Sequence, residues 1–243
     1  MKALILIPTY NEKDNIIRQV EAIMRLPLGI ESQRLDLSVV IVDDNSPDGT
    51  GASADKLSKR FERVKVIHRT GKGGRGSACI EGFKYAVKQD VEYIFEMDAD
   101  LSHDPAEIPK FLMKMQDYDL VIGSRYSKDS KIVNWGKKRA VFSKLANLYA
   151  RAVLGIPITD YTNGYRCYRK RVLENLEYDK IASTGYVVIS EMTYQIAKKG
   201  YRIGEIPTVF VNRKHGESNL SFKEISNAFI SVIKLRFNSK IKS

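Results

Sequence analysis

The sequence has few of the residues on which several classes of protein depend. Its 243 residues include only two cysteines, Cys79 and Cys167, too few for a disulfide framework or a thiolate metal site. No run of apolar residues approaches the roughly 18 that a membrane span needs, and the run after Lys2 is far shorter than that of a signal peptide. The three histidines are scattered and form no recognisable triad or metal cluster. These absences indicate a cytoplasmic protein with reduced thiols.

Positive charge, by contrast, is present in excess and is unevenly distributed. The formal net charge is +11. Residues 1–124 hold 17 Lys and Arg against 20 Asp and Glu, a net of −3, whereas residues 125–243 hold 23 against 9, a net of +14. A surplus of this size in one half is typical of proteins that meet nucleic acid or an anionic membrane, although a merely solvated surface is the simpler alternative.

Short apolar runs and amphipathic segments alternate along the first half of the chain. The apolar runs predict β-strands at Ala3–Ile7, Leu37–Val42, Val64–His68, Tyr93–Met97 and Leu120–Ile122. The segments between them have the apolar spacing of helices, at Asn15–Leu26, Ala52–Phe61, Ser77–Val87 and Pro105–Met115. This alternation predicts an α/β domain built on a mostly parallel, twisted sheet with helices on both faces.

The second half has fewer strand signals and ends in an amphipathic helix. We expect a βα-like unit at Gly164–Leu176, extended segments around Ile203–Val211, and helices at Arg139–Leu154, Ser190–Lys199 and Phe222–Phe237. No internal repeat or low-complexity linker interrupts the chain. The expected organisation is therefore a single domain over residues 1–220 and a C-terminal amphipathic, basic helix and tail over residues 221–243.

Polar residues follow each of the five predicted strands. In chain order they are Pro8-Thr9-Tyr10-Asn11-Glu12, Asp43-Asp44-Asn45-Ser46-Pro47-Asp48-Gly49, Gly71-Lys72-Gly73-Gly74-Arg75-Gly76, Asp98-Ala99-Asp100 and Gly123-Ser124-Arg125-Tyr126. One acidic segment alone would mean little, since Asp and Asn are ordinary turn and N-cap residues. The carboxyl ends of parallel strands lie at the same edge of a sheet, and ligands bind outside that edge. The convergence of these segments predicts a binding site there.

Asp98 and Asp100 stand two residues apart, directly after the fourth predicted strand. Residues i and i+2 of an extended backbone point to the same side, so both carboxylates can face one cation. A divalent ion held by one or two carboxylates, with water and substrate phosphates completing its shell, is the usual way to hold a nucleotide. Such an ion also stabilises a diphosphate as a leaving group. The simpler alternative is that the pair caps the next helix.

The segment from Gly71 to Gly76 matches the pattern G-x-G-x-x-G between a strand and a helix, and Glu96 lies twenty residues further on. This pattern occurs in dinucleotide-binding enzymes, where it belongs to the first βα turn of the fold. Two βα units precede it here, and the loop carries Lys72 and Arg75. A loop that faces phosphate or sugar is therefore a better interpretation than dinucleotide redox chemistry.

Four segments of the chain together resemble one known family. Pro8–Glu12, Asp43–Thr50, Asp98–His103 and Gly123–Tyr126 occur in the order and spacing of the family 2 inverting glycosyltransferases. Within that family the chain resembles the dolichyl-phosphate (polyprenyl-phosphate) mannose synthases. The likeness runs from Leu4 to about Phe237 and includes Asn163–Arg169, Gly204–Arg213 and Gly216–Ser218. It implies a GT-A-type fold and inverting transfer of mannose from GDP-mannose to a polyprenyl (dolichyl) monophosphate.

The resemblance also implies roles for individual residues. The donor nucleotide would be held by Pro8, Tyr10, Glu12, Val42, Asp44, Asp98, Ala99 and Asp100. The metal, Mg²⁺ or Mn²⁺, would be bound by Asp98, Asp100 and Ser102, and the catalytic residues would be Asp100 and Arg125. Phosphates of donor or acceptor would meet Arg125, Arg213, Lys214 and Asn219, the last at a position where many relatives carry lysine.

A phosphate acceptor agrees with the absence of an obvious general base. A sugar hydroxyl is hard to ionise and needs a base, whereas a phosphate monoester has a second pKa of about 6 and is already anionic at neutral pH. Such a reaction needs positive charge to hold two anions in line. The basic surplus after residue 124 can supply that charge.

A polyprenyl phosphate stays in a membrane, so we expect a peripheral protein on the cytoplasmic face of one. The helix at Phe222–Phe237, followed by Lys240 and Lys242, could lie on an anionic surface. So could the helix at Arg139–Leu154, close to Trp135. Packing on the protein's own core is the commoner fate of such helices, and a separate membrane-anchoring partner is a further alternative.

Two other functions are weighed against this one. A soluble family 2 transferase could use another nucleotide sugar, such as UDP-glucose. A nucleic-acid-binding protein could use the basic half of the chain, but the sequence has neither interleaved aromatic residues there nor a recognisable binding module. Nucleic acid is therefore not expected as a partner.

Overall fold

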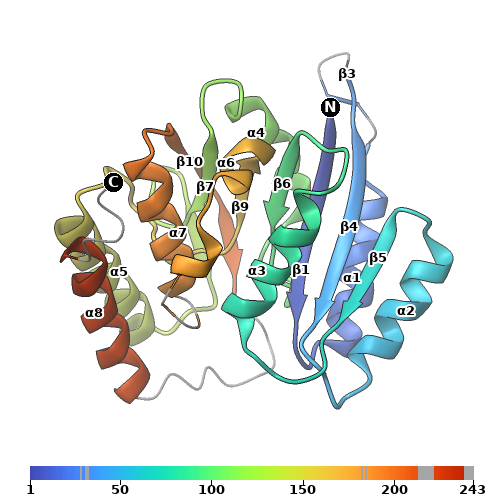
Figure 1. The fold of residues 1–243 in the computed structure, drawn as a ribbon, viewed down its shortest axis with the longest axis horizontal. Helices are drawn as coiled ribbons and strands as arrows, with labels where there is room; N and C mark the ends of the chain where they lie inside the picture. The colour runs from blue at the N-terminus through green and yellow to red at the C-terminus, as the bar shows by residue number, and fades with distance from the viewer. Residues whose placement is uncertain are drawn as a thin grey trace.

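A seven-stranded sheet forms the centre of the protein (Figure 1). The computed structural model describes residues 1–27, 29–30, 33–181, 183, 185, 187–212 and 222–237, without the side chains of 30, 33 and 222–228. The strand order is β10-β7-β9-β6-β1-β4-β5. Their bounds are β1 (Lys2–Thr9), β4 (Asp36–Asp43), β5 (Val64–His68), β6 (Tyr93–Glu96), β7 (Leu120–Ser124), β9 (Arg166–Arg169) and β10 (Ile203–Pro207).

The sheet is parallel except for β9, which pairs antiparallel with both β6 and β7. The other four of the six neighbouring pairs are parallel, namely β1 with β4, β1 with β6, β4 with β5, and β10 with β7. The carboxyl ends of β1, β4, β5, β6 and β7 therefore lie at one edge. This arrangement confirms the mostly parallel α/β sheet and the convergence of the polar segments.

Helices cover both faces of the sheet. One face packs against α1 (Lys13–Met24), α2 (Thr50–Arg60), the 3₁₀ turn η1 (Pro105–Glu107) and α4 (Ile108–Lys114). The other face packs against α3 (Arg75–Ala86), α6 (Lys170–Glu174) and α7 (Val187–Lys198). Alternate residues of β1 enter the two cores, since Ile5 faces α1 and Leu6 faces α3.

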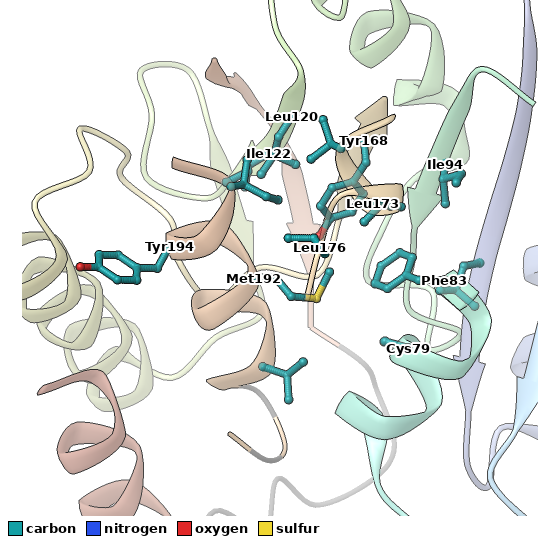
Figure 2. Close-up of a cluster of buried hydrophobic side chains, with 14 of the residues drawn as sticks. Cys79, Phe83, Ile94, Leu120, Ile122, Tyr168, Leu173, Leu176, Met192 and Tyr194 are labelled. Carbon is teal, nitrogen blue, oxygen red and sulfur yellow. The ribbon is translucent and has the colours of Figure 1, made fainter. Parts of the chain in front are cut away.

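The core on the α3 side joins the two halves of the chain. Figure 2 shows Phe83 of α3, Tyr168 of β9 and Met192 of α7 gathered between these helices and the sheet. The rings of Phe83 and Tyr168 meet edge to face, 5.4 Å between centroids. Because β9 belongs to the second half of the sequence, this packing fixes the loop before β9 beside the carboxyl ends of the first-half strands.

The expected helices and strands are all present, with ends that differ by a few residues. The extended region near Ile203 divides into β10 and β11 (Val209–Val211), which belong to different sheets. β11 pairs in parallel with β8 (Lys131–Val133), a strand that the sequence did not predict. Two further short elements are a hairpin of β2 (Gly29–Ile30) and β3 (Gln33–Arg34), and a 3₁₀ turn η2 (Tyr178–Lys180).

Two helices, α5 (Lys137–Leu154) and α8 (Phe222–Phe237), pack side by side at one end of the molecule (Figure 1). The hydroxyl of Tyr149 donates to the carbonyl oxygen of Phe229 at 2.9 Å, and their rings lie 4.6 Å apart. α8 also buries Val232 and Leu235 in the core shared with α7. Among the described residues, no helix is both long and apolar enough to span a bilayer.

Candidate active site

The ends of β1 and β4 lie side by side and bring the predicted nucleoside residues together. Pro8 is the register partner of Val42, and the backbone N–H of Asp44 donates to the carbonyl oxygen of Thr9 at 3.0 Å. The side chain of Val42 is fully buried in the core. Only the backbone of Val42 can therefore meet a nucleoside, whereas the loop after Pro8 carries polar side chains that are half-buried at Tyr10 and Glu12 and exposed at Asn11.

The loop after β1 is tied to the loop after β4 by hydrogen bonds. The backbone N–H of Asn11 donates to Ser46 Oγ at 3.1 Å, and that of Glu12 donates to Thr50 Oγ1 at 2.9 Å. Asn11 has a φ of 58°, in the left-handed region that asparagine tolerates better than most residues. Tyr10 is half-buried, and the ammonium of Lys72 lies 3.9 Å from its ring centroid. These bonds give the nucleoside end a defined shape.

Asp44 holds the glycine-rich loop against the end of β4. Its carboxylate accepts the backbone N–H groups of Gly73 at 2.9 Å and Gly74 at 2.7 Å, and it pairs with Arg69. Gly74 has a φ of 85° and a ψ of 163°, a conformation open mainly to glycine. The loop amides therefore face a carboxylate of the protein, which differs from the dinucleotide arrangement, in which they would approach a pyrophosphate.

Arg75, the first residue of α3, bridges two carboxylates beneath the same edge. Its Nη2 lies 2.8 Å from Glu96 Oε1 and 2.7 Å from Asp98 Oδ1. Glu96 is fully buried and also accepts the hydroxyl of Tyr168 at 3.2 Å and the thiol of Cys79 at 3.3 Å. Burial raises the pKa of the Cys79 thiol well above its usual range, and Glu96 raises it further. Cys79 is therefore an inert core residue.

Asp98 remains a carboxylate despite its partly buried position. Burial is the largest single influence and acts to raise its pKa, but the charge and hydrogen bonds of Arg75, together with other nearby positive groups, lower the pKa below its ordinary value. Arg125 contributes in the same direction.

Asp100 is oriented by Ser102, which the sequence resemblance places near the metal. Asp100 Oδ1 accepts the backbone N–H of Ser102 at 3.1 Å and its hydroxyl at 2.6 Å, across a turn in which Leu101 has a φ of 63°. Asp100 Oδ2 accepts no hydrogen bond from the residues that the structure describes. Among all the residues that the structure describes, no group of three or more acidic, histidine or cysteine side chains is placed to hold a metal ion without help from a substrate. The donor set thus fits an ion whose shell is completed by substrate phosphates.

Arg125 is buried and is clamped by an acidic residue that sequence reasoning missed. Its Nε donates to Asp160 Oδ2 at 2.7 Å, and its Nη2 donates to Asp160 Oδ1 at 2.8 Å and to Thr162 Oγ1 at 2.6 Å. Burial acts to raise the pKa of Asp160, but Arg125 outweighs it and holds that pKa below its usual range. The guanidinium lies 5.3 Å from the ring centroid of Trp135 and 5.4 Å from that of Phe210.

The structure thus gathers most of the residues expected at the site and adds several others. Ala99 is buried and can offer only its backbone. Three predicted phosphate contacts, Arg213, Lys214 and Asn219, lie outside the described residues. The sequence predicted no site role for Trp135, Asp160 or Asn163. It placed Arg75 in a loop expected to face phosphate or sugar, whereas Arg75 pairs with Glu96 and Asp98. Asp160 and Arg125 are 35 positions apart, so no local sequence pattern predicts that they pair.

A mostly parallel sheet whose carboxyl edge carries an Asp-x-Asp pair beside Arg75 and the buried Arg125 is the arrangement of a GT-A-type glycosyltransferase. The sequence model of glycosyl transferase family 2 matches residues 4–177, and the chain belongs to this family. It is 40% identical over 235 residues to the undecaprenyl-phosphate mannosyltransferase of Micrococcus luteus, covering 96% of this chain and 93% of that protein. It is 39% identical over 236 residues to the polyprenol monophosphomannose synthase of Mycolicibacterium smegmatis, covering 95% and 85%.

The fold is also similar to that of solved glycosyltransferases. Glucosyl-3-phosphoglycerate synthase from Mycobacterium tuberculosis, in complex with Mn²⁺, UDP-glucose and phosphoglyceric acid, superposes with a TM-score of 0.68 at 17% identity. The match covers 98% of this chain and 79% of that one. At this level of identity the similarity establishes the GT-A fold and leaves the substrate open.

Proposed function

We propose that this glycosyltransferase moves mannose from GDP-mannose to a polyprenyl (dolichyl) monophosphate, with inversion and with Mg²⁺ or Mn²⁺. The observation that carries the proposal is the identity of about two in five residues, over nearly full length, with two relatives named for mannosyl transfer to polyprenyl phosphate. The site described above supports it, because its polar groups are suited to two phosphate-bearing substrates.

The donor nucleoside is assigned to the joined ends of β1 and β4. Pro8 and Val42 offer backbone groups, and Tyr10, Glu12 and Asp44 offer polar side chains in the same loops. Asp44 already accepts the N–H groups of Gly73 and Gly74. Its contribution is therefore to hold the glycine-rich loop beside the nucleoside as much as to contact it.

The diphosphate is assigned to the loop after β6. Asp100 Oδ2 is the carboxylate oxygen best placed to bind a divalent ion, with Asp98 and Ser102 close by in the loop. Such an ion, when bound, neutralises the diphosphate and stabilises it as a leaving group. Ser102 fixes the orientation of Asp100, and Arg75 keeps Asp98 ionised and in place.

The acceptor phosphate is assigned to Arg125 and its aromatic surroundings. Asp160 and Thr162 occupy Nε and Nη2 of Arg125, while Nη1 has no acceptor among the described residues. Trp135 Nε1 is also buried and has no hydrogen-bond acceptor among the residues that the structure describes. A phosphate oxygen would satisfy such donors. The acceptor is already an anionic nucleophile, so these groups need only orient it towards the sugar.

A peripheral position on an anionic membrane follows from the lipid acceptor. The outward faces of α5 and α8 expose large apolar side chains, namely Val141, Phe142, Leu145, Leu148, Ile230, Ile233 and Phe237. Exposed basic residues accompany them, namely Lys137, Lys138, Arg139, Lys144, Arg151, Lys234 and Arg236. We call this surface the α5/α8 face. Apolar groups among basic ones are the composition of an interfacial surface.

One incubation tests the donor and the acceptor together. The full chain is mixed with Mg²⁺ or Mn²⁺, a short polyprenyl phosphate and one labelled nucleotide sugar from a panel that includes GDP-mannose and UDP-glucose. We expect label in the lipid extract with GDP-mannose. Label with UDP-glucose alone would favour another family 2 transferase, and label found only in water-soluble products would overturn the lipid acceptor.

A further inference from the structure

His103 occupies the centre of the site without reaching its surface. It is 1% exposed, stacks on Tyr165 at 4.9 Å between ring centroids, and meets the edge of Phe210 at 5.8 Å. Its Nδ1 accepts the backbone N–H of Asp98 at 3.1 Å, and its Nε2 lies 2.9 Å from Asn163 Oδ1. One ring therefore contacts both the Asp-x-Asp loop and the loop before β9.

Asn163 continues the path to Arg125. Its side-chain amide donates to the carbonyl oxygen of Gly123, directly before the loop that carries Arg125. Its backbone N–H donates to Asp160 Oδ1 at 3.0 Å, the same carboxylate that clamps Arg125. Both Asn163 and Asp160 are buried. The hydrogen-bonded path from the backbone of Asp98 to the guanidinium of Arg125 is thus continuous and shielded from water.

Two backbone groups fix the direction of every bond in this path. The N–H of Asp98 can only donate, so Nδ1 of His103 accepts and the ring proton resides on Nε2. The carbonyl of Gly123 can only accept, so the amide nitrogen of Asn163 faces it and Oδ1 faces His103. Both ring nitrogens are therefore occupied, and His103 cannot also take a proton from a substrate.

We propose that His103 is a positioning residue that holds the Asp-x-Asp loop and Arg125 in one fixed geometry. This inference rests on the proposed function, in which these two loops bind the donor diphosphate and the acceptor phosphate. In-line transfer between two anions depends on their relative placement, and a displacement of about 1 Å can cost on the order of a hundredfold in rate. Because His103 is buried, we expect neither substrate to contact it.

Two substitutions separate the hydrogen bond of His103 to Asp98 from its hydrogen bond to Asn163. In His103→Asn the side-chain oxygen can take the place of Nδ1 and keep the bond to Asp98, but the donor to Asn163 is lost. In His103→Gln the amide nitrogen can take the place of Nε2 and keep the bond to Asn163, but the acceptor for Asp98 is lost. One neutral hydrogen bond corresponds to a change of about three- to tenfold in an affinity.

The readouts are the KM for polyprenyl phosphate and the affinity for Mn²⁺ in the presence of GDP, the latter measured by electron paramagnetic resonance without turnover. For His103→Asn we expect the acceptor KM to rise about three- to tenfold with Mn²⁺ affinity unchanged. For His103→Gln we expect the Mn²⁺ affinity to fall about three- to tenfold with the acceptor KM unchanged. Ile23→Val, a buried change in α1, is the control for a loss of stability alone and should alter neither constant.

The outcomes distinguish this inference from the proposed function. Equal changes of both constants in the two variants, in step with their melting temperatures, would show that His103 only packs and would overturn the positioning role. Unchanged constants in both variants would overturn it as well. If the wild-type chain made no lipid product, the proposed acceptor would fail, while the effect of His103→Gln on Mn²⁺ affinity could still be measured.

Discussion

The guanidinium of Arg75 passes so close over Gly164 that the glycine has no room for a side chain. A Cβ at Gly164 would lie 2.1 Å from Arg75 Nη2 and 3.4 Å from Asp98 Oδ1. Gly164 belongs to the segment that includes Asn163, whereas Arg75 begins α3. Glycine here thus allows the loop before β9 to approach the cation that holds Asp98.

Gly164→Ala should therefore displace Arg75 from Asp98. Forcing an extra carbon into a packed site typically costs about 1–3 kcal/mol of stability. The double variant Arg75→Ala, Gly164→Ala removes the atoms that clash, so its loss of stability should be smaller than the sum of the two single losses by at least about 0.5 kcal/mol. Chemical denaturation of all four proteins measures this coupling. Additive losses would mean that Arg75 moves aside without cost.

Asp100→Ala should abolish transfer from any nucleotide sugar. The variant loses the carboxylate oxygen best placed for the metal, while the diphosphate keeps its charge. Since Asp100 accepts hydrogen bonds only from Ser102 among the described residues, folding should be nearly normal. Single-turnover assays with saturating Mn²⁺ and a thermal melt check both statements. More than a few per cent of residual activity would remove Asp100 from the metal site.

The local patterns of the sequence were enough for the layered fold and for much of the site. Short apolar runs such as Leu37–Val42 match β4 closely, because a strand buried on both faces needs apolar residues at every position. The polar segments after those runs then had to meet at one edge. The sequence predicted a strand in the βα-like unit at Gly164–Leu176, where β9 lies, but it could not predict that β9 runs antiparallel between β6 and β7. That placement depends on tertiary contacts such as those of Arg166, which is fully buried and donates to the backbone carbonyl oxygens of Ile189 and Tyr161.

Pairings between distant side chains escaped prediction for a related reason. The partner of Arg125 depends on how the loop before β9 docks against β7, and no spacing in the sequence encodes that contact. His103 was visible as one of three scattered histidines, and its neighbours become apparent only when β6, β7 and β9 lie together. Asp98, Asp100 and Arg125 could be found from sequence, whereas Asp160 and the geometry that joins it to Arg125 could not.

Arg125→Ala should affect stability as well as phosphate handling. The change leaves Asp160 buried without its cation, and breaking a buried pair costs about 3–5 kcal/mol. Loss of one charged hydrogen bond to the acceptor should add an activation penalty of about 1.5–3 kcal/mol. Arg125→Lys should restore only part of the stability and part of the rate, because lysine cannot make the two-pronged hydrogen bond that a guanidinium makes with the Asp160 carboxylate. An Arg125→Ala variant with unchanged rate at subsaturating acceptor would remove Arg125 from the phosphate site.

The Arg125–Asp160 pair should also make stability depend on acidic pH. Arg125 lowers the pKa of Asp160 in the folded state below its value of about 3.9 in an unfolded chain. The stabilisation is therefore complete above about pH 4 and is lost as the pH falls towards the folded-state pKa. Asp160→Asn should be less stable at pH 7 and should lose less stability than wild type between about pH 4 and pH 2. Parallel acid-denaturation curves for the two proteins would exclude this contribution.

The α5/α8 face should bind anionic membranes peripherally. Each Lys or Arg close to such a surface contributes about 1 kcal/mol, and the attraction fades within a Debye length of about 10 Å at 0.1 M salt. Sedimentation with vesicles should show binding to anionic lipid that falls steeply with added salt. Salt-insensitive binding, equal for neutral and anionic vesicles, would contradict the electrostatic account.

Point substitutions can locate that binding without unfolding the protein. Deleting α8 would uncover the core that Val232 and Leu235 close, so a surface change is the better probe. Leu148→Glu alters a side chain that is 62% exposed on α5, and Met113→Glu alters one that is 48% exposed on α4, outside the α5/α8 face. Both add the same charge, so net repulsion from anionic lipid is matched, and only Leu148→Glu also removes apolar contact. We expect the vesicle affinity to fall clearly more for Leu148→Glu than for Met113→Glu, with both proteins keeping their melting temperatures. Equal affinities for the two variants would place the membrane contact elsewhere, and no vesicle binding even by the wild type would assign the approach to the lipid to a separate anchoring partner.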